Sequence, residues 1–344
     1  MADFQRILVR ATNWVGDAVM SLPALAALRQ RFPSAHIAIL AKPWVADLYG
    51  REPFCDRVIP YTPSSWGERF AVARALKTEQ FDCAILLQNA FEAAAIACMA
   101  QIPVRIGYAR DGRSLLLTNA IAVPKTAEIP RHERFYYLEL LRRAGIIGTI
   151  PPCERIELTC AQQARSQGLQ RFVGLGMGES VIGMSPGAAY GTAKRWLPER
   201  FAEAAAALAS ETSSSIAIFG SKDERALCEA IARKIPGITQ HNFAGKTTLG
   251  EYLDLAAACK LYLTNDSGGM HIASALGVPT VAIFGATDDT ATGPTGNARV
   301  VRQPVECSPC LKRECPIDHR CMTRVEAARV VQAGMDLLQT GLLK

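Results

Sequence analysis

The chain has 344 residues, of which 49% are hydrophobic and 20% charged, a composition typical of a globular protein long enough for two domains. Its most apolar stretch, residues 91–104, is shorter than a membrane span and contains Glu92, so we expect no transmembrane helix. The N-terminus carries no signal-peptide pattern, and we therefore expect a cytoplasmic protein.

The net charge of +6 arises in residues 1–172, which hold 21 Lys and Arg against 15 Asp and Glu. Arginine binds planar anions such as carboxylates and phosphates. The arginines of this half therefore predict either a surface for an anionic partner or a solvated helical face paired with Glu133 and Glu139. They are Arg105, Arg110, Arg113, Arg131, Arg134, Arg142 and Arg143.

Strand-like and helix-like segments alternate along the chain. In the first half we predict strands at 6–10, 37–41, 58–61, 83–87, 104–107 and 121–123, and helices at 17–31, 45–49, 68–77, 88–100 and 131–144. A Pro/Gly-rich passage at 145–152 and a helix from about residue 161 follow. In the second half we predict strands at 181–185, 215–219, 238–243, 261–264 and 280–284, and helices at 198–210, 224–233, 249–259, 270–276 and 323–343.

This alternation predicts an α/β fold with two Rossmann-like, doubly wound domains facing each other across a cleft. We expect residues 1–172 to form the first domain and residues 173–322 the second, with residues 323–344 as a terminal helix.

The most informative segment is 261–285, in which an apolar strand, a polar turn, a short helix and a second strand follow one another. The turn and helix start contain Asp266, Ser267, Gly268, Gly269 and His271. Because a helix N-terminus presents free N–H groups and the positive end of its dipole, the segment predicts a phosphate site. The alternative is an ordinary turn capped by Asp266 or Ser267.

A second loop follows the first strand of the second half and contains Ser185, Gly187, Ala188 and Lys194. Small residues let backbone N–H groups approach an anion, and a lysine supplies charge to a phosphate. Since the loop would lie at the same sheet edge as Asp266, we expect the two loops to share a diphosphate. The alternative is a flexible surface loop with a solvated Lys-Arg pair.

A third loop follows the first strand of the chain and contains Thr12, Asn13, Trp14, Gly16 and Asp17. A carboxylate at Asp17 would accept a proton from a substrate hydroxyl, while Asn13 and Trp14 suit a sugar, with one hydrogen-bonding and one stacking group. The alternative reading makes Asp17 a helix N-cap.

Four cysteines lie within fifteen residues near the C-terminus. Cys307, Cys310, Cys315 and Cys321 are separated by two, four and five residues, with His319 between the last two. This spacing predicts a structural zinc or iron–sulfur site, and the alternative is a compact loop of reduced thiols.

Taken together, the segments 7–23, 185–196 and 265–271 resemble the lipopolysaccharide heptosyltransferases, especially those that add the second inner-core heptose. The resemblance implies a GT-B architecture and inverting transfer from ADP-heptose without a required cofactor. It implies that Asp17 is the base, that Lys194 contacts the donor phosphates, and that Glu251 falls near the position of the donor-ribose carboxylate.

The resemblance also implies an anionic Kdo-lipid A acceptor carrying heptose, and peripheral contact with the inner face of the inner membrane. Three other functions stay open on sequence alone: a heptosyltransferase acting on another acceptor, a sugar-nucleotide epimerase, and a metal-stabilised nucleotide-binding module. We expect no nucleic-acid binding, because basic and aromatic residues are not interleaved.

Overall fold

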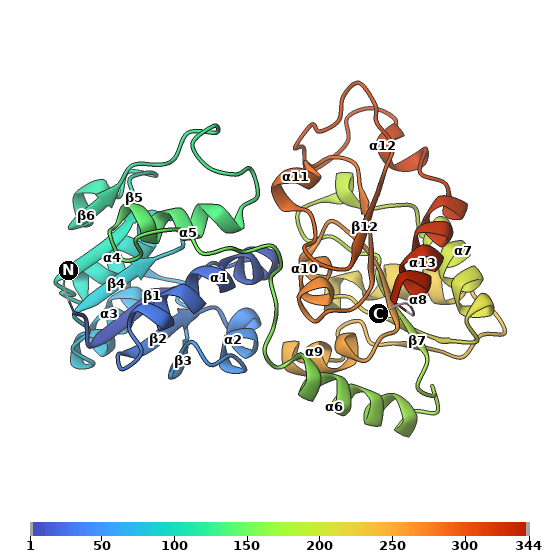
Figure 1. The fold of residues 1–344 in the computed structure, drawn as a ribbon, viewed down its shortest axis with the longest axis horizontal. Coiled ribbons are helices and arrows are strands. Elements are labelled where there is room, and N and C mark those ends of the chain that lie inside the picture. Colours follow the sequence, from blue (N-terminus) through green and yellow to red (C-terminus); the bar gives the residue numbers. More distant parts are fainter. Residues whose placement is uncertain (1–2, 342–344) are drawn as a thin grey trace. The chain divides into compact units, whose positions relative to one another are not determined.

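The computed structural model describes residues 3–341, which divide into two compact units at Cys153–Glu154. Each unit contains one six-stranded parallel sheet with flanking helices (Figure 1), which confirms the predicted α/β class. The division lies before the expected boundary at residues 172–173. Helix α6 (Ala161–Gly174) belongs to the second unit because it packs on α9 (Leu249–Ala257).

The N-terminal unit alternates strands and helices as predicted. Its elements are β1 (Arg6–Arg10), α1 (Val15–Arg31), β2 (His36–Ala41), α2 (Pro43–Gly50), β3 (Arg57–Pro60), α3 (Trp66–Thr78), β4 (Cys83–Leu86), α4 (Phe91–Met99), β5 (Val104–Tyr108), η1 (Ser114–Leu116), β6 (Asn119–Ile121) and α5 (Arg134–Arg143).

The C-terminal unit repeats the alternation after α6. Its further elements are β7 (Val181–Ser185), η2 (Thr192–Lys194), α7 (Pro198–Glu211), β8 (Ser215–Ile218), η3 (Lys222–Glu224), α8 (Arg225–Ala232), β9 (Gln240–Asn242), α9, β10 (Leu261–Asn265), α10 (Gly268–Ala275), β11 (Thr280–Phe284), α11 (Asp289–Thr292), β12 (Ala298–Arg302), α12 (Arg320–Thr323) and α13 (Ala327–Gly341).

Both sheets have the same strand order. It is β3-β2-β1-β4-β5-β6 in the first unit and β9-β8-β7-β10-β11-β12 in the second. In such doubly wound sheets the connections reverse direction beside the first strand, and ligands bind there, beyond the carboxyl ends of the strands. The loops after β1 and β4, and those after β7 and β10, therefore occupy the expected binding positions of their units.

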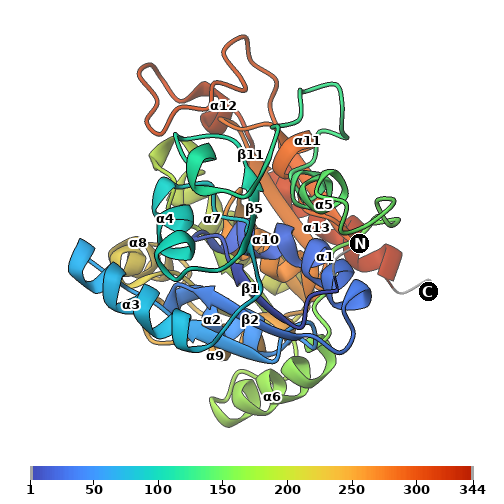
Figure 2. The same cartoon turned by 90° about the vertical axis from the view of Figure 1, so that its left-hand side faces the viewer.

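The core of the N-terminal unit follows from the two-residue period of its strands. Leu8, Leu40 and Leu86 are buried in one cluster with residues of α3 and α4, and the intervening Ile7 and Val9 are buried on the opposite face of the sheet. Helices α3 and α4 lie on one side of the strands, and α1 packs with α5 on the other (Figure 2).

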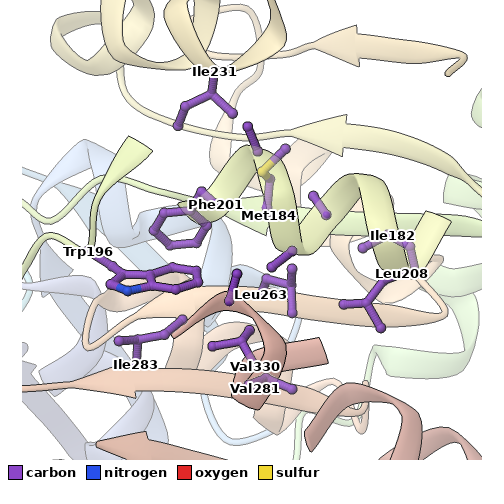
Figure 3. Close-up of a cluster of buried hydrophobic side chains, with 14 of the residues drawn as sticks. Ile182, Met184, Trp196, Phe201, Leu208, Ile231, Leu263, Val281, Ile283 and Val330 are labelled. Carbon is purple, nitrogen blue, oxygen red and sulfur yellow. The ribbon is translucent and has the colours of Figure 1, made fainter. Parts of the chain in front are cut away.

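The core of the C-terminal unit is organised around Trp196, which is almost fully buried between the sheet and α7 (Figure 3). Its indole Nε1 donates to the carbonyl oxygen of Val325 at 3.0 Å, and its ring meets Phe201 edge-on at 5.1 Å. Because Trp196 closes the loop that began at Ser185, this packing fixes one end of the predicted phosphate loop.

The structure differs from the sequence predictions at two places in the C-terminal part of the chain. Strand β12 was not predicted, because Ala298–Arg302 carries charge at both the second and last positions. The predicted terminal helix is broken between Thr323 and Ala327, and its last residues, 342–344, lie outside the described chain. No helix within residues 3–341 is long and apolar enough to cross a membrane.

The contact between α6 and α9 generates a stability prediction. A Cβ at Gly168 would lie 2.0 Å from the backbone oxygen of Asp254, so we expect Gly168→Ala to destabilise this unit by about 1–3 kcal/mol through overpacking. Gly174 in the same helix has open space around its Cα, and Gly174→Ala should be neutral or slightly stabilising. Urea unfolding of both variants tests this, and equal stability would contradict the helix contact.

Candidate active site

Lys194 and Asp266 meet at the carboxyl edge of the second sheet, as the sequence predicts. Lys194 ends the turn η2 and Asp266 directly follows β10. The Lys194 Nζ lies 2.6 Å from Asp266 Oδ2, and Thr287 Oγ1 donates to the same oxygen at 2.5 Å. The Asp266 side chain is only 4% exposed. The carboxylate therefore holds the ammonium group in place rather than offering itself to an anionic ligand, which it would repel.

Asn265 fixes the loop that carries Lys194. This residue, at the end of β10, is fully buried. Its side-chain amide donates to the carbonyl oxygen of Pro186 at 2.7 Å, and its Oδ1 accepts from the backbone N–H of Trp196 at 3.0 Å. One side chain thus satisfies backbone groups at both ends of the loop, because its amide has both donor and acceptor atoms. Sequence reasoning did not single out Asn265.

The start of α10 lies beside this pair. Ser267 is the N-cap residue, and its side chain makes no capping hydrogen bond to the helix; it interacts instead with Thr264 Oγ1 at 3.2 Å. Gly268 and Gly269 begin the helix and are half-buried. The start of α10 thus lacks a capping hydrogen bond from the Ser267 side chain, as expected of a helix N-terminus that binds an anion. His271 is buried within the helix and 5% exposed.

The first part of the phosphate loop lies against a carboxylate that sequence reasoning missed. A Cβ on Gly187 would lie 2.0 Å from Glu224 Oε1, so a larger residue at this position would displace the Glu224 carboxylate. Ala188 is buried in the loop, and Ser185 Oγ is hydrogen-bonded to the Tyr262 hydroxyl at 2.6 Å. The acidic run before α8 was visible in the sequence, but only the fold brings Glu224 to this loop.

Glu251 has two partners away from this loop. It accepts from the backbone N–H of Thr248 at 2.8 Å as part of the capping box of α9, and its Oε1 lies 2.8 Å from Arg171 Nη1. These contacts hold the Glu251 pKa below its ordinary value, chiefly through the backbone hydrogen bond.

The cysteine-containing segment 306–321 packs on the Lys194 loop. Ala193 donates its N–H to the Arg313 carbonyl at 2.9 Å and accepts from His319 Nε2 at 3.0 Å. The Tyr190 hydroxyl donates to the Leu311 carbonyl at 2.9 Å. The segment therefore supports the tip of the loop through backbone and side-chain hydrogen bonds.

All eleven cysteines of the chain are free thiols. Burial, and then the charges of Cys307, Cys310 and Cys315, raise the pKa of Cys321 to about 11, so these thiols lie near one another. Within residues 3–341, no group of three or more His, Cys, Asp or Glu side chains is arranged to hold a metal ion. The predicted structural metal stays a prediction.

The loop after β1 places Asp17 in the first turn of α1. Trp14, not Asp17, occupies the N-cap position and makes no side-chain cap, which contradicts the interpretation of Asp17 as an N-cap. Asp17 is half-buried at the carboxyl edge of the sheet, where ligands bind in this fold.

A second carboxyl group, Glu133, lies near Asp17 and was missed by sequence reasoning. Burial raises the Glu133 pKa above its ordinary value, and the charge of Asp17 raises it further. Burial and the Asp17 charge also raise the pKa of Tyr137 on α5. The site in this unit is thus a partly desolvated group of acids and phenols.

The other predicted acceptor residues differ in their exposure. Thr12 is buried and 3% exposed, whereas Trp14 is 56% exposed. Gly16 lies within the first turn of α1. The Asn13 side-chain oxygen accepts from Arg10 Nη2 at 2.9 Å, and its carbonyl accepts from Trp44 Nε1 at 2.8 Å. Asn13 and Trp14 therefore border the accessible edge, and Thr12 lies beneath it.

Most of the predicted arginine surface serves the fold instead. Arg113 is fully buried and donates to the Tyr108 carbonyl at 2.9 Å. Arg105 donates to the carbonyl of Leu116 at 2.7 Å. Arg142 and Arg143 both pair with Glu139, as the alternative reading of a paired helical face expected.

Two doubly wound parallel sheets of this strand order form the architecture of the GT-B class of glycosyltransferase. The sequence model described as glycosyltransferase family 9 (heptosyltransferase) matches residues 69–320. The chain belongs to this family.

Named relatives and a solved structure agree with this assignment. The chain is 34% identical over 309 residues to lipopolysaccharide heptosyltransferase 2 of Escherichia coli, covering 86% of this chain and 88% of that protein. It is 31% identical over 312 residues to lipooligosaccharide heptosyltransferase 2 of Haemophilus influenzae, covering 87% and 89%. The structure of E. coli ADP-heptose LPS heptosyltransferase II matches with a TM-score of 0.84 and 30% identity, covering 98% of this chain and 99% of that one.

The Lys194–Asp266 pair generates a binding prediction. Lys194→Met removes the cation expected to contact a diphosphate, so ADP affinity should fall about tenfold or more. The double variant Lys194→Met/Asp266→Asn also removes the unpaired carboxylate and its repulsion of the diphosphate, so it should bind ADP more tightly than the single variant but more weakly than the wild-type protein. Titration calorimetry measures both, with Lys234→Met, an exposed lysine paired with Glu199, as the control. Unchanged ADP affinity in the Lys194 variants would remove this residue from the site.

Proposed function

We propose that the chain transfers L-glycero-D-manno-heptose from ADP-heptose to the first heptose of the lipopolysaccharide inner core. The observation that carries the proposal is the lysine held by a buried carboxylate beside the start of α10, in a chain 34% identical to lipopolysaccharide heptosyltransferase 2 of E. coli. The names of the two relatives given above, both heptosyltransferases 2, support the second heptose as the one transferred.

The donor diphosphate occupies the edge formed by Lys194, Ser267 and the first N–H groups of α10. Ser185, Gly187 and Ala188 border it with the backbone of the preceding loop. We place the ribose carboxylate at Glu224 rather than Glu251. Glu224 lies against Gly187 of the loop and accepts a hydrogen bond from the backbone N–H of Ser221 at 2.9 Å, whereas Glu251 is also paired with Arg171. A carboxylate is the usual partner of ribose hydroxyls in this type of fold.

The transfer step uses Asp17 as the general base. Asp17 takes the proton of an acceptor hydroxyl, whose oxygen forms a bond to the anomeric carbon of the heptose. The bond between that carbon and the β-phosphate oxygen breaks with its electron pair, so ADP departs and the anomeric configuration inverts. Lys194 and the N–H groups of α10 stabilise the negative charge that develops on the departing phosphate.

The acceptor would be a Kdo-lipid A molecule that already carries one heptose. Its lipid would remain in the inner membrane, so the enzyme would work from the cytoplasmic side as a peripheral protein. The excess of basic residues in the first half of the chain supports an anionic acceptor on electrostatic grounds.

The assignment of the base is tested by substitution. Asp17→Asn should lower transfer to a mono-heptosylated Kdo-lipid A acceptor by about 10²–10⁴-fold, since a positioned base contributes that much, while ADP affinity stays unchanged. Asp47→Asn, on the exposed side of α2, is the matched control. Loss of ADP binding or of folding in Asp17→Asn would assign Asp17 a structural role instead.

The neighbouring carboxyl requires its own comparison. Glu133→Gln should retain much more transfer than Asp17→Asn, because Asp17 follows β1 at the carboxyl edge of the sheet, where ligands bind in this fold, whereas Glu133 precedes α5. If Glu133→Gln is the inactive variant and Asp17→Asn is active, the general base is Glu133 and not Asp17. If neither variant nor the wild-type protein transfers heptose, the next assay uses acceptors that lack heptose. The assay after that measures epimerisation of ADP-heptose.

A structural metal at Cys307, Cys310, Cys315 and Cys321 belongs to the proposal as a feature outside the transfer step. The short separations of the four cysteines along the sequence support it. A bound ion predicts about one equivalent of zinc or iron in protein purified without chelator, and less than about 0.1 equivalent would contradict it.

A further inference from the structure

Three residues at the carboxyl ends of neighbouring strands of the N-terminal sheet place two cations against one aromatic ring. Arg10 ends β1, Lys42 directly follows β2, and Tyr61 directly follows β3. These strands are neighbours, with Arg10 opposite Leu40 and Ala41 opposite Pro60. The Arg10 guanidinium carbon lies 4.6 Å from the centre of the Tyr61 ring, and Lys42 Nζ lies 4.4 Å from it.

The positive charge of this group is poorly compensated. Glu92 is the acid that acts on both Arg10 and Lys42, and its carboxylate is already paired with Arg69 at 2.9 Å. Burial, and then the charges of Arg10 and Arg69, lower the Lys42 pKa. Three cations thus share one carboxylate at a sheet edge, which favours an additional anion there.

The polar atoms of the cluster have unused donor capacity. The Arg10 side chain is 2% exposed, and its Nε is buried with no hydrogen-bond partner among the residues that the structure describes. Within residues 3–341 the Lys42 ammonium contacts the Tyr61 and Trp44 rings but makes no hydrogen bond or ion pair. Buried donors are normally satisfied, so the cluster has the chemistry of a site that an anion completes.

Trp44 adds a face on which a sugar ring can stack. Its side chain is 54% exposed, yet the indole is held in place because Nε1 donates to the Asn13 carbonyl at 2.8 Å. The Lys42 ammonium lies 5.9 Å from the Trp44 ring. A fixed, exposed aromatic surface beside a cation suits a saccharide that carries a negative group.

We propose that Lys42, Arg10 and Trp44 form a subsite for an anionic sugar, in which the cations hold a carboxylate or phosphate and the indole stacks on the ring. Asn13 connects this subsite to the base, since it contacts both Arg10 and Trp44 and lies on the loop that leads into the helix of Asp17. The subsite positions the acceptor by its charged sugar. The identification of the bound sugar as part of the acceptor rests on the proposed function. The prediction that the subsite binds an anion does not.

Direct binding tests the subsite without the transfer reaction. Wild-type protein is titrated with 3-deoxy-octulosonic acid, with glucose 1-phosphate and with neutral glucose, while tryptophan fluorescence or NMR is recorded. We expect both anionic sugars to bind and glucose not to bind. Whichever of the two anionic probes binds more tightly shows whether the subsite prefers a carboxylate or a phosphate. Equal binding of all three, or of none, would overturn the proposal.

Charge-preserving and charge-removing variants then locate the binding. Lys42→Met should weaken binding of the anionic probe about tenfold, Lys42→Arg should largely retain it, and Lys125→Met, at an exposed position of the same unit, should leave it unchanged. Equal affinity in Lys42→Met and wild type would contradict the site.

Steady-state kinetics separates this inference from the proposed function. In the transfer assay, Lys42→Met should raise the KM for the acceptor about tenfold while the KM for ADP-heptose stays unchanged. If no protein transfers heptose but Lys42-dependent binding of anionic sugars persists, the proposed reaction is wrong and the subsite stands. If transfer is normal and Lys42→Met alters neither binding nor the acceptor KM, the subsite is wrong and the proposed reaction stands.

Discussion

The buried amide of Asn265 is the constraint on which the candidate donor site depends. It joins the end of β10 to both ends of the loop between β7 and α7, at the point where the connections of the sheet reverse. With both ends fixed, Lys194 is brought to Asp266, and the start of α10 lies beside the pair. A buried amide without these backbone partners would be costly, so the hydrogen bonds and the loop conformation stabilise each other.

The two units use the same sheet edge for different chemistry. In the C-terminal unit a carboxylate holds a lysine, and the free N–H groups of α10 add partial positive charge. In the N-terminal unit a partly buried acid, Asp17, lies in the first turn of α1, and poorly compensated cations lie at the neighbouring strand ends. Both groups form at one edge because all strands of a parallel sheet end at the same edge, so the residues that follow them lie close together.

The sequence predicted much of the fold and of the candidate donor site because their signals are local. Apolar runs and helix periods located nearly every strand and helix, and the turn at Asp266 identified a helix start by its glycines. Strand β12 and the break before α13 were missed since charged or short elements form through tertiary packing, which overrides local preference. The arginines of residues 105–143 left two interpretations open for a related reason: sequence shows their charge but not that Arg113 is buried or that Glu139 engages Arg142 and Arg143.

The sequence by itself determined the α/β class, the family resemblance and the loops that carry Asp17, Lys194 and Asp266, because each lies within one short motif. The tertiary structure alone decided which groups meet across long separations. Thr287 and Asp266, Glu224 and Gly187, Glu133 and Asp17, and Lys42 and Arg10 come together only when strands pair and helices pack. Periodicity reports which face of an element is buried, but the partner of a buried or charged side chain is set by strand order and register.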